Sequence, residues 1–184
     1  MNEKGTSVKT KLFAAAAIAA LISGSASAAT FGVGDTLPAA TVTDGGYAYV
    51  EDGKVEYKEW SVSEIKPQGT IVLIAKAGRA AAADMVTTEF VEKLKSANVD
   101  MINFINKDDA AFGTGMFVEG AIEESMLKDP AGRVVLDRDG ELFAEWELEE
   151  QSAAVIIVKD GKVAYLHEGA LDASKENKIL ELSK

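Results

Sequence analysis

Arg79 is the residue whose type and position point most directly to ligand chemistry. It follows an apolar run that predicts a buried strand and precedes a segment that predicts a helix. At such a junction, backbone N–H groups and a guanidinium could together hold a carboxylate or a phosphate. The alternative is an ordinary surface arginine paired with an acidic neighbour such as Asp84, and the acidity of the chain favours that alternative.

A second candidate for ligand binding is the glycine-rich segment Gly113-Thr114-Gly115. Closely spaced glycines let backbone N–H groups converge on an anion without obstruction by side chains. The segment is not a dinucleotide fingerprint, because the third glycine would fall at Val118, and it is not a P-loop, because no Gly-Lys-Thr follows. The alternative is a tight turn that lets Met116 and Phe117 enter the core.

Other catalytic and metal-binding patterns are incomplete. His167 is the only histidine, and nothing in the sequence points to a serine that could complete a triad with it. The segments 137–140 and 108–109 supply carboxylates of the kind that bind calcium, but the EF-hand pattern fails at Val135 and turn chemistry explains Asp139-Gly140. We therefore expect no metal and no cofactor.

An acidic segment surrounds Trp146. Paired carboxylates could serve glycoside hydrolysis, but that reaction needs an enclosed cleft with aromatic platforms, and the chain has only two tryptophans. We interpret this segment as a solvated edge or loop. Its carboxylates are Glu145, Glu147, Glu149 and Glu150.

Composition excludes several classes of function. The chain has no cysteine, which excludes thiol redox catalysis and thiolate metal sites. Its net charge is −11 at pH 7, and residues 29–184 alone carry −13, because residues 1–28 hold three lysines and one glutamate. Such a charge repels phosphate backbones, and no local basic patch offsets it, so we expect no nucleic-acid partner.

The first 28 residues have the pattern of a cleavable signal peptide. Lys4, Lys9 and Lys11 precede the apolar run 12–22, and Ala26-Ser27-Ala28 supplies small residues for cleavage after Ala28. The apolar run is shorter than the roughly 20 residues of a membrane-spanning helix. We expect export to the periplasm, no membrane insertion after cleavage, and a single domain over residues 29–184.

The remaining sequence alternates strand and helix patterns. Hairpins are predicted around Asp52-Gly53 and Asp160-Gly161, a helical turn after Trp60, and a turn at 44–46. The predicted strands are 71–75, 99–105, 134–136, 142–146, 154–158 and 162–166, and the predicted helices are 81–97, 116–126 and 172–182. The order predicts an α/β fold in which a mixed central β-sheet is flanked by helices on both faces, with an N-terminal β-hairpin extension.

The last forty residues resemble the second half of a thioredoxin, because residues 155–163 have that family's strand, tight turn and strand. More specific segments resemble the YtfJ family of exported bacterial proteins from about residue 31 to the end. These segments are Ala77-Gly78-Arg79, residues 113–118, Ser152-Ala153-Ala154-Val155, Lys58-Glu59-Trp60, and Trp146 with Glu149-Glu150. The resemblance implies a thioredoxin-like fold and a periplasmic location, without an established activity.

Two departures from thioredoxin bear on function. The thioredoxin redox pair would fall within residues 76–83, which contain no sulfur-bearing residue, and the position of the thioredoxin cis-proline is Ala153. We expect a trans peptide there, because a cis bond without proline costs about 2.5–4 kcal/mol. A non-catalytic module that binds a peptide or periplasmic protein follows from this resemblance, with its site at the rim formed by residues 77–79, 113–117 and 152–153. The alternatives are an enzyme of unknown chemistry at the rim near Arg79, and a passive envelope protein.

Overall fold

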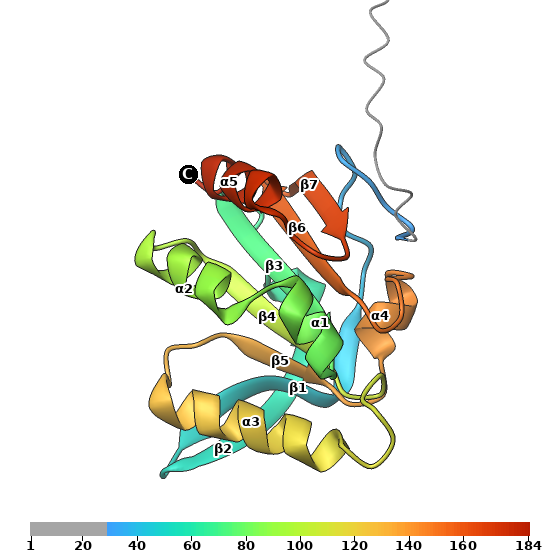
Figure 1. The fold of residues 1–184 in the computed structure, drawn as a ribbon, viewed down its shortest axis with the longest axis vertical. Coiled ribbons are helices and arrows are strands. Elements are labelled where there is room, and N and C mark those ends of the chain that lie inside the picture. Colours follow the sequence, from blue (N-terminus) through green and yellow to red (C-terminus); the bar gives the residue numbers. More distant parts are fainter. Residues whose placement is uncertain (1–28) are drawn as a thin grey trace, which may run out of the picture.

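The helices and strands alternate along the chain in the predicted order, with two exceptions described below. A computed structural model describes residues 29–184, so the predicted signal peptide lies outside the described residues. The elements are β1 (Thr41–Glu51), β2 (Lys54–Ser61), the 3-10 helix η1 (Val62–Glu64), β3 (Thr70–Ala77), α1 (Ala80–Met85), α2 (Thr88–Ser96), β4 (Met101–Asn106), α3 (Gly115–Lys128), β5 (Val134–Asp137), α4 (Glu141–Glu145), β6 (Ala153–Lys159), β7 (Lys162–Glu168) and α5 (Ala173–Leu182) (Figure 1).

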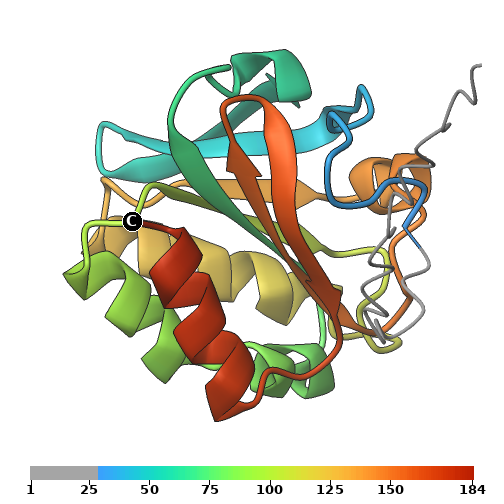
Figure 2. The same cartoon turned by 90° about the horizontal axis from the view of Figure 1, so that it is seen from above.

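The strands form one mixed sheet in the order β2-β1-β5-β4-β3-β6-β7. The three central strands β3, β4 and β5 run parallel, whereas β6 and β1 join them antiparallel on either side. The crossovers from β3 to β4 and from β4 to β5 step in the same direction across the sheet, so the helices that they carry lie on one side of it. Figure 2 shows α1, α2, α3 and α5 together on that side.

The opposite face is covered by α4, the 3-10 helix and the segment that precedes β1. Its core is aromatic: the Trp60 and Phe104 rings are 4.8 Å apart between centroids and edge to face, and Trp146 packs against Phe104 at 6.0 Å. Trp60, Phe104 and Trp146 are almost completely buried. This core holds α4 and the end of β2 against the sheet.

The helix-covered face has two separate cores rather than one. Under α2 and α5, Phe90, Leu94 and Ile179 pack on the inward residues of β3 and β6. Under α3, Ile122 and Met126 pack on Leu136 of β5 and on the β1–β2 hairpin. Between these two cores runs the outer face of β4.

Two predicted elements were wrong. The segment 142–146 is the helix α4, because Leu142, Phe143 and Trp146 all turn toward the core, which an alternating strand would not allow. The predicted helix 81–97 is broken into α1 and α2 at Val86, which is extended and buried, and the Thr87 hydroxyl caps α2 by accepting from the Phe90 N–H at 3.3 Å.

The predicted turn at 44–46 was also wrong, because this segment lies inside β1. The register of β1 with β2 shifts between Val42 and Tyr47, where Gly45 and Gly46 adopt φ of +101° and +88°. The extra residues form a bulge that lets β1 pair with β2 on one side and β5 on the other.

The other secondary-structure predictions are confirmed. Both hairpins form, residues 62–64 make the helical turn, and Asp172 caps α5 by accepting from the Lys175 N–H. The peptide bonds of residues 29–184, including that before Ala153, are trans. Within the same residues, every helix is too short or too polar to cross a membrane.

Candidate functional site

The residues predicted at the rim follow the carboxyl end of β3. Ala77 donates its N–H to the Ser152 carbonyl at 2.9 Å, and Gly78 donates to the Asn106 carbonyl at 2.7 Å. A Cβ atom at Gly78 would lie 2.7 Å from that same carbonyl oxygen. Gly78 is therefore required for the close approach of the chain to the end of β4, and both Ala77 and Gly78 are buried.

The Arg79 guanidinium makes three hydrogen bonds within the protein. Its Nε donates to the Asp109 carbonyl at 2.8 Å, one terminal nitrogen pairs with the Asp109 carboxylate at 3.2 Å, and the other donates to Gln151 Oε1 at 2.6 Å. The Asp109 carboxylate also accepts from the Gln151 N–H. Arg79 thus ties two loops together, and its partner is Asp109 rather than the neighbouring Asp84.

The segment 113–115 is a turn that leads into α3. Gly113 has φ of +76°, and the N–H and hydroxyl of Thr114 both donate to the Ala111 carbonyl, at 2.9 and 2.6 Å. The Thr114 donors are therefore already used. The alternative prediction that this turn buries Met116 and Phe117 was wrong, because their side chains are 73% and 70% exposed.

Ser152 and Ala153 do not reach the surface. Both are buried, and the Ser152 hydroxyl points to the Met85 sulfur at 3.6 Å. The Ala153 carbonyl accepts from the Gly169 N–H at 2.7 Å, as the Ser152 carbonyl does from Ala77. Residues 77–79 therefore do approach residues 152–153, as predicted, and they share a groove lining with Thr114 and Phe117. The exposed surface of the rim does not include Ser152 and Ala153, because both lie buried beneath α1.

A long groove continues from the exposed part of this rim across the molecule. It has a volume of about 1320 Å³, and its lining comes from β4, from α1 and α2, and from α3. Figure 1 shows β4 between α2 and α3. Its floor includes Met101, Asn103 and Ile105, the half-buried residues of β4. The wall formed by α3 consists of Phe117, Val118, Ala121, Ile122, Ser125 and Met126.

One lysine lines the groove without a partner. The side chain of Lys76, the penultimate residue of β3, makes no hydrogen bond or ion pair with any residue of the described segment 29–184. Burial lowers the pKa of its ammonium group from the ordinary lysine value. Val72 and Ile74, which alternate with Lys76 along β3, face the same side of the sheet.

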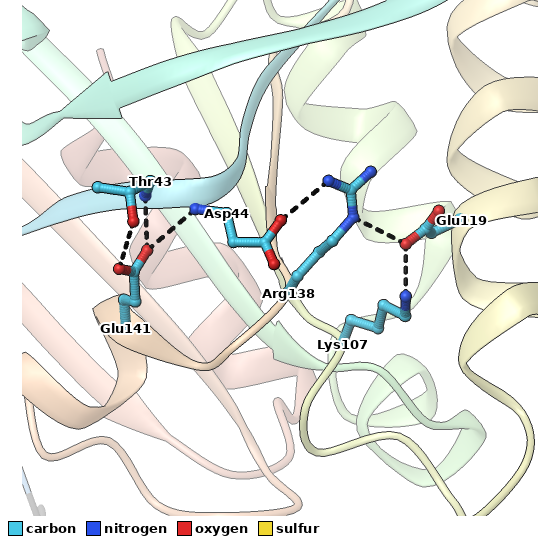
Figure 3. Close-up of polar contacts among 6 residues, drawn as sticks. All are labelled: Thr43, Asp44, Lys107, Glu119, Arg138 and Glu141. Carbon is cyan, nitrogen blue, oxygen red and sulfur yellow. Dashed lines mark hydrogen bonds and ion pairs between the residues drawn. The ribbon is translucent and has the colours of Figure 1, made fainter.

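A polar network beside this site fastens α3 to the sheet (Figure 3). Glu119 accepts from Lys107 at 2.5 Å and from Arg138 at 2.9 Å, and Arg138 continues to Asp44 at 3.1 Å. The hydrogen bond from Lys107 contributes most to lowering the pKa of Glu119. Glu141 completes the network by accepting from the backbone and hydroxyl of Thr43. Because every cation in Figure 3 already has a carboxylate, we assign this network a structural role.

Asp137 is a buried carboxyl at the end of β5. Its two oxygens accept from the N–H groups of Glu141 and Leu142, at 2.8 and 3.0 Å, so it positions the first turn of α4. Burial raises the pKa of Asp137 to about 6, although these N–H donors act in the opposite direction. In the sequence, Asp137 was a candidate only as a calcium ligand.

The remaining candidates for chemistry are dispersed. His167, on β7, donates from Nε2 to the Ala170 carbonyl at 3.1 Å and does not line the groove. Within residues 29–184, acidic and histidine side chains form no group of three that could hold a metal ion. The carboxylates that follow β5 around Trp146 are solvent-exposed, apart from the partly buried Glu141.

Comparison with known proteins identifies the family. The chain matches the family "Bacterial protein of unknown function (YtfJ_HI0045)" over residues 31–184. It is 31% identical to the uncharacterized protein YtfJ of Escherichia coli K12 over 163 residues, which cover 85% of this chain and 88% of that protein. The chain belongs to the YtfJ family. A second YtfJ-like relative, an uncharacterized protein of Haemophilus influenzae, is 28% identical over 80% of this chain and 82% of its own length.

Solved structures show that the fold of this YtfJ family member is thioredoxin-like. The thioredoxin domain of a thiol-disulfide oxidoreductase from Bacteroides vulgatus matches with a TM-score of 0.55 and 12% identity, over 84% of this chain and all of that one. A putative thioredoxin reductase from Burkholderia cenocepacia matches with a TM-score of 0.54 and 17% identity, over 82% of this chain and 96% of that one. At these identities the likeness concerns the fold alone.

Sequence reasoning missed Lys76 and Asn103, two polar residues that line the groove of this YtfJ family member. A usable signal was present, because Lys76 is the only charged residue in the apolar strand Thr70–Ala77. The groove itself has no signature in the sequence, since it depends on the spacing between α2 and α3.

Proposed function

We propose that this protein is an exported, non-catalytic binding module that holds a peptide, or a segment of a periplasmic protein, in the groove over β4. The observation that carries the proposal is the groove itself, about 1320 Å³ in volume and walled by helices on both sides. Ligand sites in proteins are concave and mostly apolar, with a few polar groups that set orientation. The groove has this composition.

Exposed apolar side chains at one end of the groove support a macromolecular partner. Phe112 is fully exposed, and Met116 and Phe117 are each more than two-thirds exposed, with Phe117 also lining the groove. Contiguous exposed apolar groups mark interaction sites, and aromatic residues and methionine are enriched in interfaces. We call Phe112, Met116 and Phe117 the exposed apolar patch.

The alternative, an enzyme of unknown chemistry centred on Arg79, has less support. Arg79 donates three hydrogen bonds to Asp109 and Gln151, so a substrate would have to displace an internal ion pair before reaching it. His167 is on β7 and contributes nothing to the groove. General acid–base catalysis needs groups within hydrogen-bond reach of one reacting atom, and these two residues do not provide that arrangement.

The binding proposal is tested by photo-crosslinking in cells. A benzoylphenylalanine at position 117 preserves an aromatic side chain in the exposed apolar patch. A benzoylphenylalanine at position 178, which replaces an exposed lysine of α5, serves as the control. We expect a discrete adduct from position 117 that is absent from position 178. Equal background from both positions would contradict a stable partner at this groove.

Export is tested separately by the mass of the purified protein from the periplasmic fraction. The pattern of Lys4, Lys9 and Lys11 before the apolar run 12–22 supports cleavage after Ala28. We expect a mature chain that begins at Ala29. An intact mass that includes Met1, or recovery in the cytoplasmic fraction alone, would contradict export.

A further inference from the structure

The charged side chains that line the groove determine which charge a bound ligand can carry. Lys95 is paired with Glu92 and Asp129, both at 3.2 Å, and Arg133 is paired with Asp100. Arg79 is likewise paired with Asp109, as described above. Among the described residues that line the groove, this leaves the ammonium of Lys76 as the cation without a carboxylate.

A half-buried, unpaired ammonium is costly, and a ligand carboxylate would relieve that cost. Removing a charged group from water without a partner is unfavourable, whereas a charge-assisted hydrogen bond is among the stronger polar interactions in proteins. The lowered pKa of Lys76 has the same cause. The ligand therefore carries one anionic group at this end of the groove.

The rest of the groove favours apolar side chains. Val91 of α2 faces Val118 and Ile122 of α3 across it, and Met101 and Ile105 form part of the floor. The six residues of β4 span about 20 Å at roughly 3.3 Å per residue, which is the length of an extended hexapeptide.

A polar residue in the middle of the floor distinguishes a peptide from a hydrocarbon chain. The Asn103 side-chain amide makes no hydrogen bond within residues 29–184 and lines the groove between Met101 and Ile105. A lipid chain laid over this amide would remove it from water without a partner, whereas the backbone of a peptide supplies both donors and acceptors. Thr88 and Ser125 on the walls offer further polar contacts of the same kind.

The end of the groove next to Lys76 is bounded by protein. Lys76 pairs in register with Ile105, the penultimate residue of β4, and the loop that follows β4 contributes Ala111 and Thr114 to the lining. This loop is held in place by the Arg79–Asp109 ion pair. A chain that reaches Lys76 therefore meets the loop, which suits a chain end better than a segment that runs through.

We propose that the groove binds the carboxyl-terminal end of an extended apolar peptide, with its terminal carboxylate on the ammonium of Lys76 and its backbone on Asn103. This inference rests on the proposed function and adds to it the chemical class and the direction of the bound chain. It places the specificity of the site at Lys76, outside the predicted rim residues 77–79, 113–115 and 152–153.

The test compares two forms of one probe. Acetylated hexapeptides that alternate valine or leucine with alanine are titrated into the protein calorimetrically, once with a free terminal carboxylate and once with a terminal carboxamide. We expect the carboxylate form to bind at least about tenfold more tightly to the wild-type protein. Lys76→Gln should reduce that difference to less than about twofold, because a neutral amide at position 76 can hydrogen-bond to either terminal group.

Lys162→Gln, at an exposed position on β7, is the matched control and should keep the full preference for the carboxylate. A cooperative urea unfolding transition shows that Lys76→Gln remains folded. Equal binding of the two forms by the wild-type protein, or a preference that survives Lys76→Gln, would overturn the inference. So would saturable binding of palmitate with no binding of any peptide.

Failure of this inference is distinguishable from failure of the proposed function. If no hexapeptide binds and position 117 still gives a discrete adduct in cells, the groove has a partner of another chemistry and only the carboxyl-terminal assignment is lost. If position 117 gives no adduct while the carboxylate preference depends on Lys76, the ligand is a free peptide rather than a stable protein partner.

Discussion

At the scale of single residues, Arg79 acts as an internal connector between segments that are far apart in the sequence. Its side chain is 25% exposed and that of Asp109 is 13% exposed, so their ion pair is partly shielded from solvent. It joins the end of β3 to the loop after β4 and to Gln151.

Arg79→Gln should lower the free energy of unfolding by about 1–3 kcal/mol, because it leaves the Asp109 carboxylate without its charged partner. Urea denaturation measures the change. Arg133→Gln removes a more exposed ion pair with Asp100 and should cost less than about 1 kcal/mol. Equal costs for the two variants would contradict the connecting role of Arg79.

Asp137 makes stability depend on pH. Its pKa in the folded protein is raised to about 6 from an ordinary value of 3.8, so the folded state binds the proton more tightly than the unfolded state. The stability that this proton provides is present below pH 3.8 and is lost as the pH rises through 6. The shift corresponds to about 3 kcal/mol at most.

Asp137→Asn should therefore gain stability relative to the wild-type protein as the pH rises from 4.5 to 7. Urea denaturation of both proteins at several pH values in this range gives the difference between their free energies of unfolding. The contributions of the other titrating groups cancel in this difference. A difference that stays constant with pH would show that burial does not raise the pKa of this carboxyl.

At the scale of elements, the bulge in β1 positions the hairpin on which α3 packs. A Cβ atom at Gly46 would lie 2.0 Å from the Lys58 carbonyl oxygen, and the residue has φ of +88°. Gly53, in the β1–β2 turn, has φ of +77° but open space around it. Replacing Gly53 by alanine therefore introduces backbone strain alone, whereas replacing Gly46 introduces both backbone strain and a steric clash.

Gly46→Ala should destabilise the protein by about 3 kcal/mol or more, because it adds a clash with the backbone of β2 to the strain of a positive φ. Gly53→Ala should cost only about 1–2 kcal/mol, from strain alone. Thermal unfolding of the two variants provides the comparison. A Gly46→Ala variant no less stable than Gly53→Ala would contradict the close packing of the bulge.

The elements that the sequence predicted correctly are those whose pattern is local. The continuous apolar run in β3, the Asp-Gly turns and the Asp172 cap each specify their structure within a few residues. The helix α4 was missed because Leu142, Ala144 and Trp146 alternate as in a strand. The hydrogen bonds that start the helix are accepted by the Asp137 carboxylate, which precedes this segment. The break at Val86 was missed because the apolar pattern continues through it.

The candidate site was predictable only in part, for a similar reason. Residues 77–79 and 113–115 were recognised by type, and residues 77–79 and Thr114 do line the groove. That Arg79 is paired with Asp109, and that Ser152 and Ala153 are buried, depends on contacts between distant segments. Lys76 and Asn103 are recognisable as candidate binding residues only from the groove between α2 and α3, which both residues line.

At the scale of the whole molecule, the two faces of the sheet are covered differently: the helices on one face leave a groove between them. The core under α2 and α5 and the core under α3 are separate, and the groove over β4 lies between them. The opposite face is filled by a continuous core that includes Trp60 and Trp146. The helix-covered face therefore carries an open groove, whereas the opposite face is closed by its core.

The central claim is that a partner occupies this groove, and one substitution tests it directly. Ala121 is an exposed groove residue of α3, so Ala121→Trp should fill the groove without disturbing the core, whereas Glu124→Trp adds the same side chain on a part of α3 that does not line the groove. The measurement is the yield of the position 117 adduct in cells that contain either variant. We predict at least a fivefold loss with Ala121→Trp and no change with Glu124→Trp; equal yields from two equally stable variants would contradict the claim.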